Sequence, residues 1–590
     1  MLVYFEGYYY PDKSVFDKIK VEDPDKYVVP VQRDRKGWYV EHIGYLFVSM
    51  EGGGEPVFIL PKNFLKNDTA HPEEGLTLLG MPGVKPEKVF DSDPEKNILS
   101  QRGQETFLPE LSLWLFRAMS RYREEREKEK TEIQKDELYY RAPDHGAYDR
   151  DFLSTAIHLI DFLSDHRNLF TQISKINNSG RAAVDWSKTI QQHPFIKGGK
   201  PYYLDLRIKD KAINIDEELI VLYYSVLRYL KEKFHFRINY GEINYPLKTR
   251  SEIQNYLDTG VGKRRMRDMK GKYFRDDLLE LWALLDAFFD CNISRDDKDP
   301  IKECLVTKQF HKVFERMVDA LISNSDKLER LKNQKDGKLV DHLFLYKSLV
   351  GSKHTIYYIG DSKYYPDANH AEDVALYKQF TYARNAIQYN IDQYYIHHKK
   401  NPDAIRYRDK DTEGYNVTPN FFICPKIEAG NLDFTQHSFA AASWEYEPNR
   451  HFEDRLFDRD TLLLREYEIN LIFLIAAYGA YEDCWTDSLH KTIREDMIDF
   501  LNETYNFFKI EPMDYPVSSQ NGLIDKWPFT KVFRRTLEGK AYKEDEDSKD
   551  IILAFEKKTE TGKKDYKFVH DEIKDYVIGG SIDDPIPLKP

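Results

Sequence analysis

The strongest constraint on the fold of this chain is a change of hydrophobic periodicity between residues 307 and 427. The stretch "TKQFHKVFERMVDALIS" spaces its apolar residues three and four apart, which is typical of a helix. We then read two strands in "KLVDHLFLYKSL" and "HTIYYIGDSKYY", a helix in "AEDVALYKQFTYARNAIQ" and a strand in "TPNFFICPKI". This order of elements predicts a mixed sheet flanked by helices.

Two charged residues stand in the second of these strands, where an apolar run is expected. In "YYIGDSKYYP", Asp361 and Lys363 are two residues apart, so their side chains leave the same face of the strand. The preceding strand carries Asp341, and the short loop "VGSK" can fold that strand back beside the next one. We therefore expect two carboxylates and one ammonium group to meet.

These three side chains suit the hydrolysis of a phosphodiester. Magnesium takes oxygen ligands, orients the scissile phosphate and offsets the charge of the transition state. We expect Asp341 and Asp361 to hold Mg²⁺ and Lys363 to position or help deprotonate the attacking water. Carboxylate, carboxylate and lysine in this order form the PD-(D/E)xK nuclease signature, with Val340 in place of its usual proline. A salt bridge between Asp361 and Lys363 at a sheet edge is the structural alternative.

The spacing of an acid and a lysine also occurs at residues 296–298 and 556–558. Both of these matches stand in polar runs, which we interpret as loops. Only Asp361 and Lys363 end an apolar run that follows a strand with an aspartate and precedes an amphipathic helix. Context therefore favours the pair at 361 and 363.

The two helices beside these strands add three polar candidates. The first helix is expected to bury a stripe formed by Phe310, Phe314, Met317, Val318 and Leu321. Glu315 borders this stripe, where it either reaches the metal site as a further ligand or is solvated. Gln379 and Tyr382 lie within one turn of the second helix and match a Gln-and-Tyr motif of this nuclease class. They would contact phosphate or orient Lys363, or else form a hydrogen-bonded helix face.

A basic segment, "TGVGKRRMRDMKGKYFR", covers residues 259–275. Its Gly262 and Lys263 do not end a Walker A loop, because Leu257 stands where that loop needs glycine and Arg264 where it needs Ser or Thr. The segment remains a candidate nucleic-acid contact, with an ordinary solvated surface as the alternative. The candidate residues are Lys263, Arg264, Arg265, Arg267 and Lys270.

The chain has 590 residues, which is too long for a single hydrophobic core. We predict an α/β multidomain protein with a β-rich N-terminal domain at 1–105, which binds DNA or a partner, and a mainly helical region at 106–270. A PD-(D/E)xK nuclease domain with a helical C-terminal extension is expected at 271–590. Within that extension, the apolar spacing predicts helices at 461–483 and 488–508.

Composition excludes several other classes of protein. The four cysteines are far apart and form no Cys-x-x-Cys pair, which argues against a zinc knuckle and a disulfide framework. The sequence has no run of eighteen apolar residues and no recognisable leader, so we expect a soluble, cytoplasmic protein without membrane contact. A formal net charge of -13 argues against a nonspecific coat on nucleic acid but leaves room for a local basic groove.

Several short stretches along the chain are informative because of their order: "HIGYLFVS", "VFILPKNFL", "DWSKTI", "FHKVFERMV", "VDHLF", "YIGDSKYY", "YKQFTYA" and "FEDRLFDRDTLLLREYEINLIFLIAAY". In this order they resemble the LlaJI family of restriction endonucleases, whose nuclease subunits are related to McrC. The resemblance implies a type II or type IV-like PD-(D/E)xK endonuclease that cuts double-stranded DNA in a bacterial restriction or anti-phage system. It also implies a separate McrB-like AAA+ GTPase partner, which agrees with the missing Walker A loop. We interpret Trp186 of "DWSKTI" as a packing anchor.

Two other functions stay open at the level of sequence. A non-catalytic scaffold or regulator of an AAA+ motor would keep this fold without chemistry, although the presence of all three core residues argues against decay. A nuclease acting on RNA or on single strands would use the same site. Nothing in the sequence separates these substrates from duplex DNA.

Overall fold

The computed structural model describes residues 1–11, 16, 31–32, 37–50, 53–67, 75–88, 99, 104–128, 138–141, 152–166, 169, 172–177, 183–214, 217–241, 243–290, 301–323, 340–351, 354–364, 373–397, 407–428, 431–442, 454–461, 463–481, 486–512, 536–544, 549–580 and 582–590. The chain divides into two compact units. Unit 1 comprises Met1–Pro61, Val84–Phe116 and Glu132–Lys308, and unit 2 comprises Lys62–Gly83, Arg117–Thr131 and Gln309–Pro590.

Unit 1 contains a five-stranded sheet with the order β1-β5-β4-β13-β8. Its strands are β1 (Leu2–Phe5), β4 (Ile43–Met50), β5 (Gly53–Leu60), β8 (Tyr139–Arg141) and β13 (Ile301–Thr307). β13 pairs antiparallel with β4 although more than 250 residues separate them. Its buried Glu303 accepts hydrogen bonds from Tyr45 Oη at 3.0 Å and from the backbone N of Phe152 at 2.8 Å. The glutamate thereby satisfies the backbone N–H group of Phe152, the first residue of helix α3 (Phe152–Asp165).

The rest of unit 1 is mainly helical. Its helices are α3 (Phe152–Asp165), α4 (Trp186–Thr189), α5 (Glu218–Phe234), α6 (Arg250–Asp258), α7 (Val261–Met269) and α8 (Asp276–Asp290), and α2 (Phe107–Lys128) contains the division between the units. Three short antiparallel pairs complete it: β2 (Val31–Gln32) with β3 (Trp38–Tyr39), β9 (Gln172–Asn177) with β12 (Ile208–Ile213), and β10 (Phe195–Lys197) with β11 (Lys200–Tyr202). Trp186 at the start of α4 is 59% exposed, so the prediction that it anchors packing is wrong.

Unit 2 contains a second five-stranded sheet, with the order β14-β15-β16-β18-β17. Its strands are β14 (His342–Lys347), β15 (Thr355–Ser362), β16 (Pro419–Lys426), β17 (Phe439–Ala441) and β18 (Leu463–Asn470). β14 runs antiparallel to β15, whereas β15, β16 and β18 are parallel to one another. The sheet is therefore mixed, as predicted.

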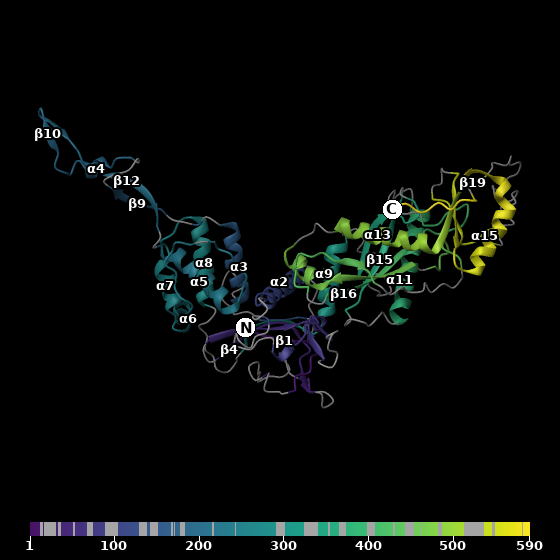
Figure 1. The fold of residues 1–590 in the computed structure, drawn as a ribbon, viewed down its shortest axis with the longest axis horizontal. Coiled ribbons are helices and arrows are strands. Elements are labelled where there is room, and N and C mark those ends of the chain that lie inside the picture. The colour runs from purple at the N-terminus through teal and green to yellow at the C-terminus, as the bar shows by residue number, and fades with distance from the viewer. Residues whose placement is uncertain are drawn as a thin grey trace. The chain divides into compact units, whose positions relative to one another are not determined.

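Helices cover both faces of this mixed sheet. Four helices of unit 2 accompany it: α9 (Phe310–Ile322), α11 (Asp373–His397), α12 (Leu471–Gly479) and α13 (Thr486–Thr504). Figure 1 shows α9, α11 and α13 beside β15 and β16. His490 of α13 stacks on Phe344, which also stacks on Tyr358. Asn390 of α11 instead bonds Tyr357, whose side chain leaves the opposite face of β15. The sheet therefore lies between α11 and α13.

Gly360 allows β15 and β16 to approach closely. A Cβ at this position would lie 2.3 Å from Cε2 and 2.4 Å from Cζ of Phe421. Phe421 packs in turn beside Phe344, so the ring has no room to retreat within this layer. The glycine thus brings the end of β15, which carries Asp361, into register with β16.

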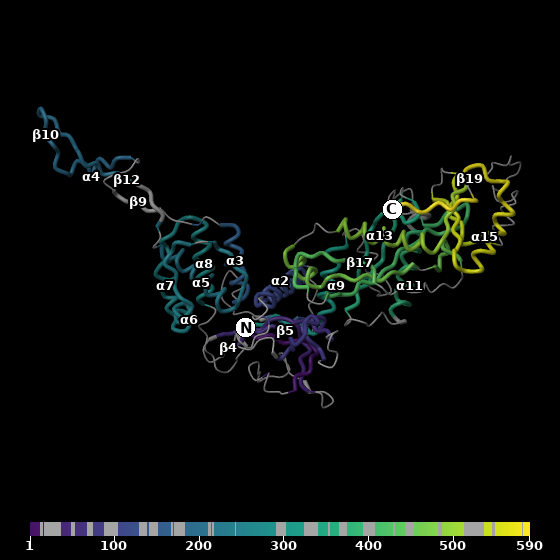
Figure 2. The backbone as a smooth tube through the Cα atoms, viewed as in Figure 1, coloured from purple at the N-terminus to yellow at the C-terminus, as the bar shows by residue number. Residues whose placement is uncertain are grey.

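The C-terminal part of unit 2 forms a small sheet with the order β20-β21-β19-β22. Its elements are β19 (Tyr505–Pro512), β20 (Ala541–Tyr542), β21 (Ile551–Glu556), α15 (Glu560–Ile573) and β22 (Val577–Gly580), and unit 2 also contains the pair β6 (Leu65–Asn67) and β7 (Leu76–Leu78). Figure 2 follows the yellow end of the trace through β19 and α15. Phe508, Leu553 and Val569 are among the residues that form the core of this part.

The predicted mixed α/β class is confirmed, and so is the order of α9, β14, β15, α11 and β16. The predicted stripe of α9 is also confirmed, because all five of its residues are buried. The helix predicted at 461–483 is wrong over residues 463–470, which form β18. Among the described residues, no helix is long and apolar enough to cross a membrane.

Candidate active site

The antiparallel pairing of β14 and β15 brings Asp341 and Asp361 together. His342 pairs with Gly360, so Asp341, the residue before β14, lies beside Asp361 near the end of β15. The backbone N of Ser362 donates a hydrogen bond of 3.0 Å to Asp341 Oδ2, which fixes this carboxyl group against β15. The side chains of Asp341 and Asp361 are also hydrogen-bonded to each other.

Lys363 lies just beyond β15 and forms an ion pair with Asp361 Oδ2. The backbone N of Lys363 donates to the carbonyl O of Ile423, which continues the pairing with β16. Its Nζ also lies 5.4 Å from the ring centre of Phe422. Asp361 is only 7% exposed, so its charge is carried in a largely buried place and is compensated by the lysine. The three predicted core residues therefore converge.

The carboxyl groups of this cluster disfavour one another's charge. Burial holds the pKa of Asp341 well above its usual range, and the neighbouring Asp361 and Glu315 add to this effect. Burial likewise raises the pKa of Glu315, with a further contribution from Asp361 that Lys363 opposes. Such crowding of acids is relieved when a cation binds between them.

Glu315 reaches this cluster from α9, as its place beside the buried stripe suggested. The next residue, Arg316, donates through Nε to Glu125 Oε2 at 2.7 Å, and Tyr478 Oη donates to the same oxygen at 2.9 Å. These bonds fasten α9 to α2 and α12. Glu315 is therefore held by an anchored helix, in the electrostatic reach of Asp341 and Asp361.

Gln379 and Tyr382 of α11 are buried, and Gln379 is 0% exposed. Gln379 Nε2 donates to the carbonyl O of Ile359 at 2.9 Å and to Asn420 Oδ1 at 3.2 Å. These contacts tie α11 to β15 and β16 two residues before Asp361. The structure thus places Gln379 behind the acidic cluster, where it supports the backbone of β15.

A chain of polar contacts that the sequence analysis did not single out supports Asp341 from the interior. His342 is 0% exposed, with Nε2 at 2.5 Å from Ser362 Oγ and Nδ1 at 3.4 Å from Asp319 Oδ1. A carboxylate only accepts hydrogen bonds, so Nδ1 carries a proton, and in the neutral imidazole Nε2 then accepts from Ser362 Oγ. Ser362 is also the residue whose backbone N holds Asp341. A histidine within the apolar stretch "VDHLF" was the available signal.

We expect Ser362→Ala to lower the free energy of unfolding by about 1 to 3 kcal/mol, because it leaves the buried Nε2 of His342 without a donor. Thermal unfolding followed by circular dichroism measures the change. Ser488→Ala provides the matched control, since Ser488 is an exposed serine of α13 in the same unit. Equal unfolding curves for Ser362→Ala and the native chain would show that His342 finds another partner.

The donor set fits a hard divalent cation. Among the described residues, no three His, Cys, Asp or Glu side chains are arranged to hold a metal ion by themselves. Magnesium needs fewer protein ligands, because it is commonly bound by one or two carboxylates together with waters and substrate phosphate oxygens. Asp341 and Asp361 supply such a pair of carboxylates, with Glu315 nearby.

The second acid and lysine match, at 556–558, does not lie in a loop as interpreted. Glu556 is the last residue of β21 and is buried, whereas Lys558 is exposed. The nearby buried carboxylate of Asp454 is already neutralised by Lys540, whose Nζ lies 2.9 Å from its Oδ2. Glu556 and Lys558 therefore do not form a cluster of carboxylates and a lysine like the one at Asp361 and Lys363. The match at 296–298 lies outside the described residues.

The basic segment predicted to contact nucleic acid forms α7 and the turn after it. Lys263 is ion-paired with Asp286 at 3.0 Å and with Asp290 at 3.1 Å, and Arg265 is paired with Glu218. Arg264, Arg267 and Lys270 are exposed, and Lys270 lies over the ring of Trp282. Two of the five predicted cations are thus engaged by acids of unit 1.

Comparison with known proteins finds a family that part of this chain matches. The model of the LlaJI restriction endonuclease matches residues 86–374, a range that contains Glu315, Asp341, Asp361 and Lys363. The comparison with curated proteins gave no match. One similar solved structure is a refined half-complex from a tetradecameric assembly of Thermococcus gammatolerans McrB AAA+ hexamers with bound McrC. It is 10% identical, covers 80% of this chain and 86% of that chain, and has a TM-score of 0.24.

A restriction endonuclease is a nuclease, so this match assigns phosphodiester hydrolysis to the chain at the level of the family. The match also includes the two strands that carry the acidic cluster and the lysine. Residues 86–374 of this chain match the LlaJI restriction endonuclease family, the family that the order of its motifs indicated.

Proposed function

We propose that this chain is a magnesium-dependent endonuclease of the PD-(D/E)xK type and the DNA-cleaving subunit of a restriction system. The observation that carries the proposal is the convergence of Asp341, Asp361 and Lys363 at the adjoining ends of β14 and β15. The family match supports the reaction class. The sheet lying between α11 and α13 supports the proposed nuclease core.

In this proposal, Asp341 and Asp361 hold the cation, with Glu315 as a further acid within reach. A bound Mg²⁺ would supply Lewis-acid activation of the scissile phosphate and stabilise the charge that develops on it. Asp341 is kept in place by the backbone N of Ser362, so its oxygens need little reorganisation when substrate arrives.

Lys363 is the residue that we propose to position the attacking water. As an ammonium ion paired with Asp361, it donates hydrogen bonds and offsets negative charge near the reacting phosphate. Gln379 and Tyr382 act indirectly in this account. Gln379 fixes the backbone of β15 at Ile359 and therefore the direction in which Asp361 and Lys363 leave the strand.

The proposed partner is an AAA+ GTPase, because the family resemblance implies one and the sequence contains no Walker A loop. The proposed division of the chain remains 1–105, 106–270 and 271–590, with the first part binding DNA or the partner. The acidic cluster, the lysine and α11 all fall in the third part.

The experiment that tests this function is cleavage of duplex plasmid, single-stranded DNA and RNA by the full chain with Mg²⁺, with and without the AAA+ partner and GTP. The proposal expects cutting of duplex DNA that depends on the partner and GTP. Preferential cutting of RNA or single-stranded DNA would support the alternative that this chain is a nuclease for those substrates. No cutting of any substrate would support a scaffold.

A further inference from the structure

A polar pocket lies between α5 and α6 of unit 1, in a part of the chain to which the proposed chemistry assigns nothing. It has a volume of about 520 Å³ and is lined by Arg228, Glu232, Lys233, Thr249, Arg250, Ser251 and Gln254. Three of these side chains are cationic and one is acidic. None of them is aromatic or aliphatic, so the pocket offers charged groups, hydroxyls and one amide, and the carbon stems of its long side chains line the rest.

The single acid of the pocket is already compensated. Arg228 Nε lies 2.7 Å from Glu232 Oε1, which leaves Lys233 and Arg250 as the cations of the pocket that are not ion-paired with its acid. Lys233 Nζ donates to Tyr229 Oη at 2.9 Å and to Gln254 Oε1 at 2.7 Å, and Arg250 Nη1 donates to the backbone O of Glu232 at 3.4 Å. These partners are all neutral, and within the described part of the chain no carboxylate lies at ion-pair distance from either cation.

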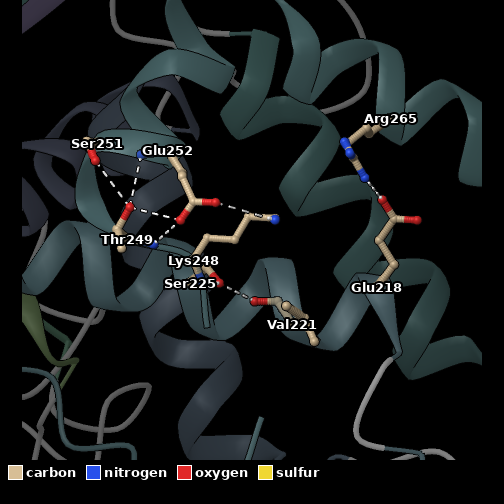
Figure 3. A network of polar contacts seen from close by, with 8 residues as sticks. All are labelled: Glu218, Val221, Ser225, Lys248, Thr249, Ser251, Glu252 and Arg265. Carbon is tan, nitrogen blue, oxygen red and sulfur yellow. Dashed lines mark hydrogen bonds and ion pairs between the residues drawn. The ribbon is translucent and has the colours of Figure 1, made fainter. Parts of the chain in front are cut away.

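The walls of the pocket are held in place by bonds that do not use these cations. Figure 3 shows Thr249 and Glu252 in a reciprocal capping box at the start of α6, with Ser251 Oγ at 3.1 Å from Thr249 Oγ1. The backbone N of Lys248 donates to Ser225 Oγ at 2.9 Å, which fastens the entry to α6 onto α5 (Figure 3). Arg250 and Lys233 are therefore presented by two helices whose connection is fixed.

Burial also affects the charge of Lys233. It lowers the pKa of Lys233 to about 8; the carboxylates of Glu55 and Asp258 oppose this lowering, and Arg250 adds to it. An anion between the two cations would favour the charged form of the lysine again.

We propose that this pocket binds a phosphate group of a DNA backbone through Lys233 and Arg250, with the Ser251 hydroxyl as a further donor. A backbone phosphate suits this pocket, because lysine, arginine and serine side chains are common partners of DNA phosphate oxygens. The inference rests on the proposed nuclease function and gives unit 1 a sequence-independent role in holding the substrate. It also differs from the predicted contact at α7, where Glu218 already binds Arg265 (Figure 3).

The test measures binding of a labelled short duplex to the full chain in EDTA, over a range of salt concentrations. The variants are Arg250→Ala, Lys233→Gln and the double variant. Lys197→Ala is the matched control, because Lys197 is an exposed lysine of β10 in unit 1, outside both the pocket and the basic segment 259–275. We expect the double variant to weaken binding by about tenfold and to reduce the salt slope by about 1 to 2, whereas Lys197→Ala changes affinity less than about twofold.

Arg250→Lys keeps the charge and should restore most of the affinity lost in Arg250→Ala. An unchanged salt slope in the double variant would overturn the proposal, and so would an equal loss of affinity in Lys197→Ala. GTP binding is measured in the same variants. If the native chain binds GTP and the double variant does not, while duplex binding is unchanged, the pocket is a nucleotide site and the proposal is overturned. Cleavage is measured separately in Mg²⁺. A chain that binds duplex through this pocket but never cuts it would contradict the proposed nuclease function and leave the proposed phosphate site intact.

Discussion

Replacing Lys363 with alanine is expected to slow plasmid cleavage by about a hundredfold to ten-thousandfold, while duplex binding in EDTA stays within about twofold of the native chain. The reason is that Lys363 is placed beside Asp361, where it offsets charge and positions water, and is only one of many cations on the chain. Initial rates of plasmid cleavage with Mg²⁺, the AAA+ partner and GTP measure the effect.

Lys347→Ala is the matched control for this variant. Lys347 is an exposed lysine at the far end of β14, so it shares the sheet with Lys363 but not the acidic cluster. Equal cleavage by Lys363→Ala and the native chain would mean that Asp361 and Lys363 form a structural ion pair. The catalytic groups would then lie elsewhere.

Asp361→Asn is expected to weaken binding of Mn²⁺, used as a probe for Mg²⁺, by at least about tenfold, because it replaces one of two carboxylate ligands by an amide. Titration calorimetry of the full chain without DNA measures the affinity. Asp499→Asn, on the exposed face of α13, controls for the loss of one negative charge. Unchanged Mn²⁺ affinity would remove Asp361 from the metal site.

Asp361→Asn also leaves Lys363 without its partner, and this loss of an ion pair lowers stability. Asp341→Asn provides a second variant that keeps the ion pair. If both variants have the same unfolding temperature and the same Mn²⁺ affinity as the native chain, the cluster is not a metal site.

Much of unit 2 could be predicted from the sequence because its signals are local. The apolar spacing of α9 and the apolar runs of β14 and β15 are set by neighbouring residues, and the short loop between the strands fixes which of them pair. For that reason, the proximity of Asp341 and Asp361 could be predicted from the sequence. The support of Asp341 by Ser362 and His342 was missed, because it depends on a backbone bond and a tautomer that no spacing specifies.

Other elements depend on partners far along the chain. β13 completes the sheet of unit 1 by pairing with β4, and "IKECLVT" alone gives no sign of that partner. β18 lies within the apolar run "TLLLREYEINLIFLIAAY", where a buried parallel strand and a helix have the same composition. The exposure of Trp186 could not be predicted either, because a tryptophan in a short motif is more often buried.

The most direct test of the central claim is the Mg²⁺ dependence of plasmid cleavage by the native chain and by Asp361→Asn, each with the AAA+ partner and GTP. Our account predicts that the native chain cuts only when Mg²⁺ is present and that Asp361→Asn does not cut at any Mg²⁺ concentration at which the native chain is saturated. Undiminished cutting by Asp361→Asn, or cutting by the native chain in EDTA, would contradict it.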